Sequence, residues 1–109
     1  MDVALDSFKN WQVIKVAGQV DSKTVSDLRD FIDSELKQGH PVALELTEVP
    51  FMSSAGLRTL LTLQRKTTDM GVDLALIGVA PEIADTMKVT GFYQFFTIFE
   101  SLQNLPGAE

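Results

Sequence analysis

The sequence contains no cysteine and a single histidine, His40. Without cysteine there are no disulfide bonds, no thiolate nucleophile and no zinc site built on thiolates. His40 precedes a proline in an expected turn, which makes it a poor candidate for an acid or base group. Closely spaced His or Asp ligands, a Walker-type phosphate loop and the glycine fingerprint of dinucleotide sites are also missing. We therefore expect no enzyme activity, no metal ion and no cofactor.

Basic residues are scarce, since 9 Lys and Arg stand against 15 Asp and Glu, for a formal net charge of -6. An acidic chain is unsuited to capturing the phosphate backbone of a nucleic acid. No apolar run approaches the roughly 18 residues of a membrane-spanning helix, and residues 1–10 lack the basic and apolar regions of a signal peptide. The sequence predicts a cytoplasmic protein without direct nucleic-acid binding or membrane insertion. It does not determine the oligomeric state, for which a monomer is favoured.

What the chain does contain is enough apolar residues, 45% of 109, for one hydrophobic core. We expect a single domain over residues 1–109, ending in a loose tail at 106–109. Branched and aromatic runs predict strands, and apolar residues at i, i+3 and i+4 predict helices. The expected strands are 11–17, 42–47, 72–78 and 95–99, with 3–5 as a further short candidate, and the expected helices are 25–36, 54–70, 81–90 and a short 101–105.

The alternation of these elements over short connections predicts the α/β class. We expect a mixed sheet of four to five strands with parallel pairs, covered by about four helices. An aromatic group near the C-terminus is expected to be mostly core, by its spacing along the predicted last strand, with a ligand site or self-association as the alternative. Its members are Phe92, Tyr93, Phe95, Phe96 and Phe99. Trp11 is likewise expected to be a packing residue.

The segment most suggestive of function is 51–57, between a buried strand and an amphipathic helix. Ser53 is suited to the N-cap position, and Ser54 then occupies the first turn with an accessible hydroxyl. Ala55 and Gly56 are unusually small for a first turn, because glycine costs about 0.8 to 1.0 kcal/mol relative to alanine in a helix. Two explanations stay open, a close approach of another backbone and simple relief of crowding against the neighbouring strand.

At these residues the sequence resembles the anti-sigma factor antagonists, single-domain members of the STAS family. The family's central loop reads roughly Phe-Met/Ile-Asp-Ser-Ser/Ala-Gly-Leu, and residues 51–57 here read Phe-Met-Ser-Ser-Ala-Gly-Leu. Residues 18–21 are similar to the family's Gly-x-Leu/Val-Asp turn, and Gly91-Phe92 before an aromatic segment is a further similarity. The resemblance spans nearly the whole chain.

The resemblance implies that Ser54 is phosphorylated by a serine kinase that is also the anti-sigma factor. Unmodified protein would bind this kinase and release a sigma factor, phosphorylation would end binding, and a metal-dependent serine phosphatase would restore it. One departure is that Ser53 stands where the family usually has Asp, so the helix keeps a cap but loses a carboxylate. Phosphorylation of Ser53 instead is the alternative.

The expected partner-binding residues are Asp21, Ser53, Ser54, Ala55 and Gly56. Asp21 is expected near the loop because both follow strand ends on the same side of the sheet, although it could merely cap the first helix. Lys23, Thr47 and Arg58 are weaker candidates for the rim. Two other functions remain open, a STAS subunit of a membrane transport or lipid-trafficking complex and a small-molecule or nucleotide sensor.

Overall fold

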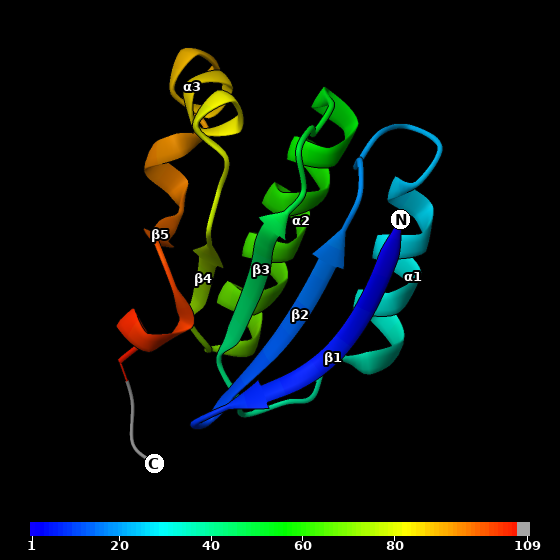
Figure 1. Cartoon of the computed structure of the whole chain (residues 1–109). Helices are drawn as coiled ribbons and strands as arrows, with labels where there is room; N and C mark the ends of the chain where they lie inside the picture. Colours follow the sequence, from blue (N-terminus) through cyan, green and yellow to red (C-terminus); the bar gives the residue numbers. More distant parts are fainter. Residues whose placement is uncertain (107–109) are drawn as a thin grey trace.

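Five strands form one mixed sheet in a computed structural model that describes residues 1–106 (Figure 1). In chain order the elements are β1 (Asp2–Phe8), β2 (Trp11–Ala17), α1 (Val25–Glu35), β3 (Val42–Glu48), α2 (Ser54–Met70), β4 (Leu74–Ile77), α3 (Pro81–Thr90), the 3₁₀ turn η1 (Tyr93–Phe95), β5 (Thr97–Phe99) and the 3₁₀ turn η2 (Leu102–Asn104). Within residues 1–106, none of the helices has the length and apolar character needed to cross a membrane.

The strand order in the sheet follows the sequence, β1-β2-β3-β4-β5. β1 and β2 form an antiparallel hairpin, and the three later pairs are parallel, with an α-helix in each of their three crossovers. The α/β class with parallel pairs is therefore confirmed. β1 is longer than the candidate strand at 3–5, because it pairs with β2 along its full length. Its exposed charged residues weaken the strand pattern in the sequence, which is why the sequence predicts only its middle.

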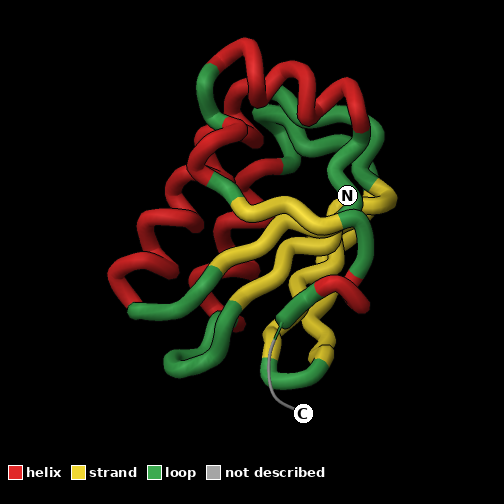
Figure 2. Tube along the Cα trace, turned by 90° about the vertical axis from the view of Figure 1, so that its left-hand side faces the viewer, coloured by secondary structure: helices red, strands yellow, loops and turns green. Residues whose placement is uncertain are grey.

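The main core lies between the sheet and the helices, which gather on one side of it (Figure 2). Alternate strand residues such as Ile14, Leu44 and Leu76 point to this side and are fully buried. The facing side chains come from all three α-helices, among them Leu28, Leu57, Leu60, Leu63 and Met87. This packing fixes the helix ends relative to the strand ends, which is where the candidate site lies.

The opposite face of the sheet is covered in part by the C-terminal segment. Trp11 and Leu105, exposed by 5% and 2%, belong to a second apolar cluster there. The indole Nε1 of Trp11 donates a hydrogen bond of 2.7 Å to the carbonyl of Pro106. The packing role expected for Trp11 is confirmed. Of the tail predicted at 106–109, Pro106 makes this contact, and 107–109 lie outside the described residues.

The predicted aromatic strand at 95–99 is wrong at its start. Gly91 ends α3 with a φ of 82°, and the chain then turns through η1, with Phe95 N–H bonded to the carbonyl of Phe92. Only Thr97–Phe99 pairs with β4. Phe95 is 52% exposed and Tyr93 36%, so these two are not core residues as predicted, whereas the other three phenylalanines of the group are half-buried.

Two other boundaries also differ. The strand predicted at 72–78 begins at Leu74, because Val72 N–H bonds the carbonyl of Thr67 and still belongs to the end of α2. The short helix predicted at 101–105 is a single 3₁₀ turn, η2. Leu105 is extended there, as the residue before a proline prefers, which stops the turn from continuing. The described residues thus contain three α-helices instead of about four.

Candidate functional site

The candidate site is built on the start of α2, where Ser53 is the N-cap residue. Its backbone is extended and its Oγ accepts a hydrogen bond of 3.3 Å from the Gly56 N–H. Its carbonyl accepts the first helical bond, from Leu57 N–H at 3.0 Å. The capping role predicted for Ser53 is confirmed, so this half-buried hydroxyl is already engaged in holding the helix.

Ser54 is the first residue of α2 and its side chain is exposed. Its hydroxyl makes no hydrogen bond to any of residues 1–106, whereas its carbonyl accepts one of 3.4 Å from the Nε of Arg58. Of the two adjacent serines, Ser54 is therefore the one whose Oγ is accessible and uncommitted. This arrangement suits a phosphoacceptor.

The loop before α2 is joined to the segment before α1. Val20 forms a parallel bridge with Met52, and its N–H donates to the carbonyl of Phe51 at 3.0 Å. The Val20 carbonyl accepts a bond of 2.8 Å from Ser53 N–H. The pairing of β2 with β3 is thus resumed past the end of the sheet, and it fixes the two loops as one unit.

Gly56 lies directly against this junction. A Cβ at Gly56 would stand 3.2 Å from the Val20 carbonyl oxygen, 2.9 Å from its Cγ1 and 2.5 Å from the Cγ of Met52. Real Cβ atoms essentially never come within 3.0 Å of another heavy atom. The two contacts below 3.0 Å are with side chains and the tight contact at 3.2 Å is with the backbone of Val20, so both explanations for the small residues, crowding and close approach of another backbone, apply at Gly56. Ala55, beside it, is half-buried.

Asp21 follows Val20 and so lies at the same end of the sheet, as predicted. Its Oδ1 accepts hydrogen bonds from the backbone N–H groups of Lys23 at 2.9 Å and Thr24 at 3.1 Å. These bonds, first the one from Lys23 and then the one from Thr24, lower the pKa of the Asp21 carboxyl. The side chain therefore caps the turn that leads into α1, and the half-exposed Asp21 lies at the same end of the sheet as the candidate site.

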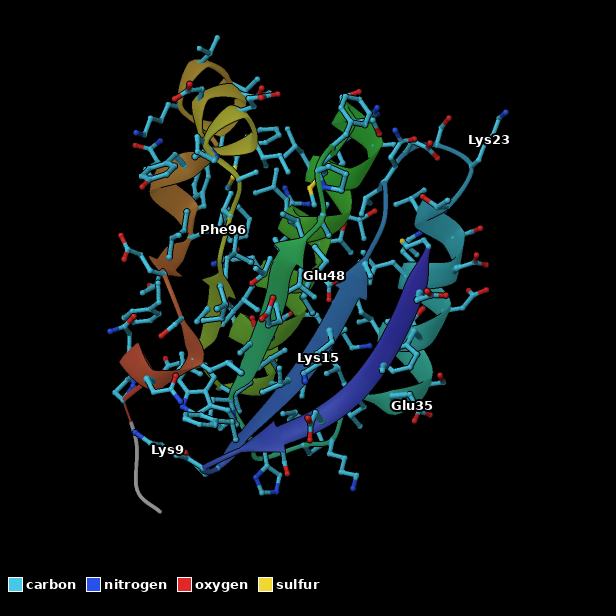
Figure 3. All side chains as sticks on the ribbon, viewed as in Figure 1. Lys9, Lys15, Lys23, Glu35, Glu48 and Phe96 are labelled. Atoms are coloured by element: carbon cyan, nitrogen blue, oxygen red, sulfur yellow. The ribbon has the colours of Figure 1, made fainter. Side chains whose placement is uncertain are left out.

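The weaker rim candidates Lys23, Thr47 and Arg58 lie on three different segments near the loop. Lys23 projects from the tip of the segment between β2 and α1, away from the sheet (Figure 3). Thr47 is exposed but contacts Gly78 of the neighbouring connection, where a Cβ would meet its Oγ1 at 2.5 Å. Arg58 is exposed one turn beyond Ser54. His40 is remote, because its carbonyl binds the side chain of Gln12 at the other end of β2.

Phe51 is a further candidate residue, which sequence reasoning placed in the segment 51–57 but not among the expected partner-binding residues. It is 49% exposed and lies three residues before Ser54, next to the exposed Pro50. A large apolar side chain in a short loop is the signal that could have found it, since loops favour polar residues. An exposed aromatic beside an accessible hydroxyl suits contact with a protein partner.

Residues 3–105 match the model of the STAS domain family. Over 102 residues the chain is 24% identical to BtrV of Bordetella bronchiseptica, to which the role of anti-sigma factor antagonist is attributed, with 93% of this chain and 88% of BtrV covered. It is 20% identical over 106 residues to the anti-sigma F factor antagonist of Paenibacillus polymyxa, covering 95% of this chain and 91% of that protein.

The fold is similar to that of the anti-sigma factor antagonist SpoIIAA, solved in two states. The unphosphorylated form superposes with a TM-score of 0.75 at 18% identity, covering 94% of this chain and 91% of SpoIIAA. The phosphorylated form, from Bacillus, gives a TM-score of 0.70 at 18% identity, with 94% and 95% covered. At such identity the likeness establishes the fold.

Proposed function

Because the chain belongs to the STAS domain family, we propose that it is an anti-sigma factor antagonist whose partner binding is switched by phosphorylation of Ser54. The unmodified chain binds an anti-sigma factor that is also a serine kinase, and this binding releases a sigma factor in the cytoplasm. Phosphorylation ends the binding, and a metal-dependent serine phosphatase reverses it. The observation that carries the proposal is the exposed Ser54 hydroxyl at the start of α2, after a loop that the Val20–Met52 bridge joins to the segment of Asp21.

The group transfer needs only an acceptor from this chain. The Oγ of Ser54 attacks the γ-phosphorus of ATP bound to the kinase, the bond to the β-phosphate oxygen breaks, and ADP leaves. The hydroxyl proton passes to a base of the kinase or to solvent. A serine that is exposed and without a hydrogen bond from its hydroxyl to residues 1–106 loses no internal contact in this step.

The phosphate is compatible with the fold. It adds about -1.5 to -2 charges at pH 7, and a helix N-terminus favours such a group by roughly 0.3 to 1 kcal/mol. The switch therefore acts at the interface with the partner. Burying an uncompensated charged group there costs on the order of 2 to 5 kcal/mol, which corresponds to a loss of about 30-fold to several thousandfold in affinity.

Ser53 is the less suitable acceptor. Its hydroxyl is half-buried and accepts the capping bond from Gly56 N–H, so a kinase would have to displace that contact to reach it. This contrast supports Ser54 over the alternative site.

The test is phosphorylation of the purified chain by the anti-sigma serine kinase of the same organism with radiolabelled ATP. We expect label in the wild type and in Ser53→Ala, and none in Ser54→Ala. Label retained in Ser54→Ala but lost in Ser53→Ala would move the switch to Ser53. Co-purification of the chain from its native cell with a membrane transport complex, together with no label at either serine, would instead favour the transport alternative.

A further inference from the structure

A hollow of about 260 Å³ lies between α1 and α2, directly beside the first turn of α2. Each helix contributes one arginine to its wall, Arg29 from α1 and Arg58 from α2. The remaining lining residues are uncharged: Ser22, Val25, Ala55, Thr59 and Thr62. In a chain of net charge -6, a hollow with two guanidinium groups and no carboxylate in its wall is an unusual concentration of positive charge.

Neither arginine is paired with a carboxylate among residues 1–106, where the ion pairs are Lys15 with Asp6 and Lys66 with Asp33. The Lys66–Asp33 pair lies in a second, smaller hollow of about 70 Å³ that adjoins the first between α1 and α2. The charges of these two residues cancel each other. The positive charge of Arg29 and Arg58 therefore has no counter-charge in the described protein surface that lines the hollow.

Arg58 is placed four residues after Ser54 on the same side of α2. Side chains at i and i+4 of a helix lie with their Cβ atoms about 5 to 6 Å apart. The Nε of Arg58 already reaches back to the Ser54 carbonyl at 3.4 Å, so the guanidinium group is held over the first turn. A planar guanidinium presents paired N–H donors that match two oxygens of a phosphate.

We propose that this arginine hollow binds the phosphomonoester carried by Ser54, with Arg58 donating to the phosphate oxygens from the next turn of α2 and Arg29 from α1. The inference rests on the proposed function for the presence of that phosphate, and it adds a second effect to the switch. Phosphorylation then both introduces negative charge and withdraws two arginines from the surface offered to a partner. The ligand class is a phosphate dianion held intramolecularly.

The test needs neither kinase nor partner. The full chain is produced with phosphoserine incorporated at position 54 by genetic encoding, and the second ionisation of the phosphate is followed by ³¹P NMR as a function of pH. A nearby guanidinium favours the dianion and lowers this pKa from its usual value near 6. We expect Arg58→Gln to raise the phosphate pKa by on the order of 0.5 to 1 unit, less than for a buried pair because Arg58 is exposed.

Arg65→Gln is the matched control, because Arg65 is an exposed arginine of the same helix two turns beyond Arg58, about 10 Å further along the axis. It should leave the phosphate pKa unchanged, and Arg29→Gln should raise it by less than Arg58→Gln. Arg58→Lys should keep part of the effect, and about 1 M salt should reduce it in the wild type. Tryptophan fluorescence checks that each variant is folded.

Equal phosphate pKa values in the wild type and Arg58→Gln would overturn the inference, as would an equal rise in Arg65→Gln, which would report only the overall charge of the helix. The outcome is separable from the proposed function. A phosphate pKa that depends on Arg58, combined with no labelling of Ser54 by the kinase, would remove the function and keep the hollow as a phosphate site. Labelling without such dependence would remove this inference alone.

Discussion

Val20 and Met52 form an isolated parallel bridge beyond the end of the sheet. The bridge brings the segment before α1 against the loop before α2, so that the Asp21 carboxylate and the Ser54 hydroxyl lie at one end of the protein. Because the contact is made by backbone atoms, it does not depend on the identity of the side chains at the rim. Its one requirement is a small residue at Gly56.

Substitution of Gly56 by alanine tests this requirement. Alanine is the better helix former by about 0.8 to 1.0 kcal/mol, but its Cβ would stand 3.2 Å from the Val20 carbonyl and closer still to two side chains. Met52 can move aside, whereas the paired Val20 backbone cannot. We expect a net loss of on the order of 1 to 2 kcal/mol in the free energy of unfolding, measured in urea.

The double variant with Val20→Ala provides the control, because it removes the Cγ1 that lies 2.9 Å from the place an alanine Cβ would take at position 56. The two substitutions should together cost less than the sum of their separate effects. A Gly56→Ala protein more stable than the wild type would show that the helix start can relax away from Val20.

The two adjacent serines should differ in their effect on stability. Ser53→Ala removes the capping bond to Gly56 N–H and should cost about 1 kcal/mol of unfolding free energy. Ser54→Ala removes a hydroxyl without a partner among residues 1–106 and should stay within about 0.5 kcal/mol of the wild type. Chemical denaturation of Ser53→Ala and Ser54→Ala measures this difference in the free energy of unfolding. Equal losses in the two variants would argue against Ser53 as the helix cap.

A negative charge at position 54 should separate binding from folding. Ser54→Asp is expected to weaken binding to the anti-sigma kinase by about 30-fold or more, with almost no change in melting temperature, because the start of a helix tolerates an anion. Calorimetric titration and thermal denaturation give the two readouts. Ser34→Asp, an exposed position near the far end of α1, adds the same charge as a control. Wild-type affinity in Ser54→Asp would contradict the proposed switch.

The lowered pKa of Asp21 predicts that the free energy of unfolding depends on pH in the acid range. Its folded-state pKa is lowered, by the N–H of Lys23 and then that of Thr24, below the value of about 3.9 for an unfolded chain. The stabilisation from these bonds is thus present above that value and is lost as the pH falls through the folded-state pKa. Asp21→Asn should therefore show a shallower loss of stability on acidification.

Urea denaturation of the wild type and Asp21→Asn between about pH 6 and pH 2.5 checks this, with the difference at pH 6 serving as the internal reference. A constant difference between the two proteins over the whole range would show that the Asp21 side chain acts only as a neutral hydrogen-bond acceptor.

The C-terminal segment should contribute to stability through Leu105. This side chain is only 2% exposed and packs on the face of the sheet opposite the α-helices. Leu105→Ala should therefore lower the free energy of unfolding by about 2 to 4 kcal/mol. It should also shift the emission of the neighbouring Trp11 to longer wavelength. Val89→Ala removes an apolar side chain that is 88% exposed and should change stability by less than about 0.5 kcal/mol. If both variants behave alike, the segment is not part of the folded core.

Local chemistry explains which parts of the structure could be read from the sequence. The bounds of α2 and its Ser53 cap follow from apolar periodicity and from the hydrogen-bonding preference of a serine, both of which act within a few residues. The turn at Tyr93–Phe95 depends instead on how α3 ends and where β4 leaves room for β5, which strand propensity does not encode.

The same distinction applies to the candidate site. The place of Ser54 after the cap predicts an accessible hydroxyl, but the shared hollow of Arg29 and Arg58 arises from two helices meeting in space. The exposure of Phe51 likewise depends on how its loop packs. No spacing along the chain relates residues 29 and 58. Such groupings come only from the tertiary structure.

The hydrogen bond from Trp11 to Pro106 fixes the position of the last residue that the structure describes. Trp11 begins β2, whereas the bridge to Met52 follows the other end of that strand, so Pro106 lies about a full strand length from the loop of Ser54. Met1, by contrast, packs against Gly18, close to the loops of the site. A fluorophore attached at position 106 would consequently leave the surface around Ser54 unobstructed, and one attached at position 1 would crowd it.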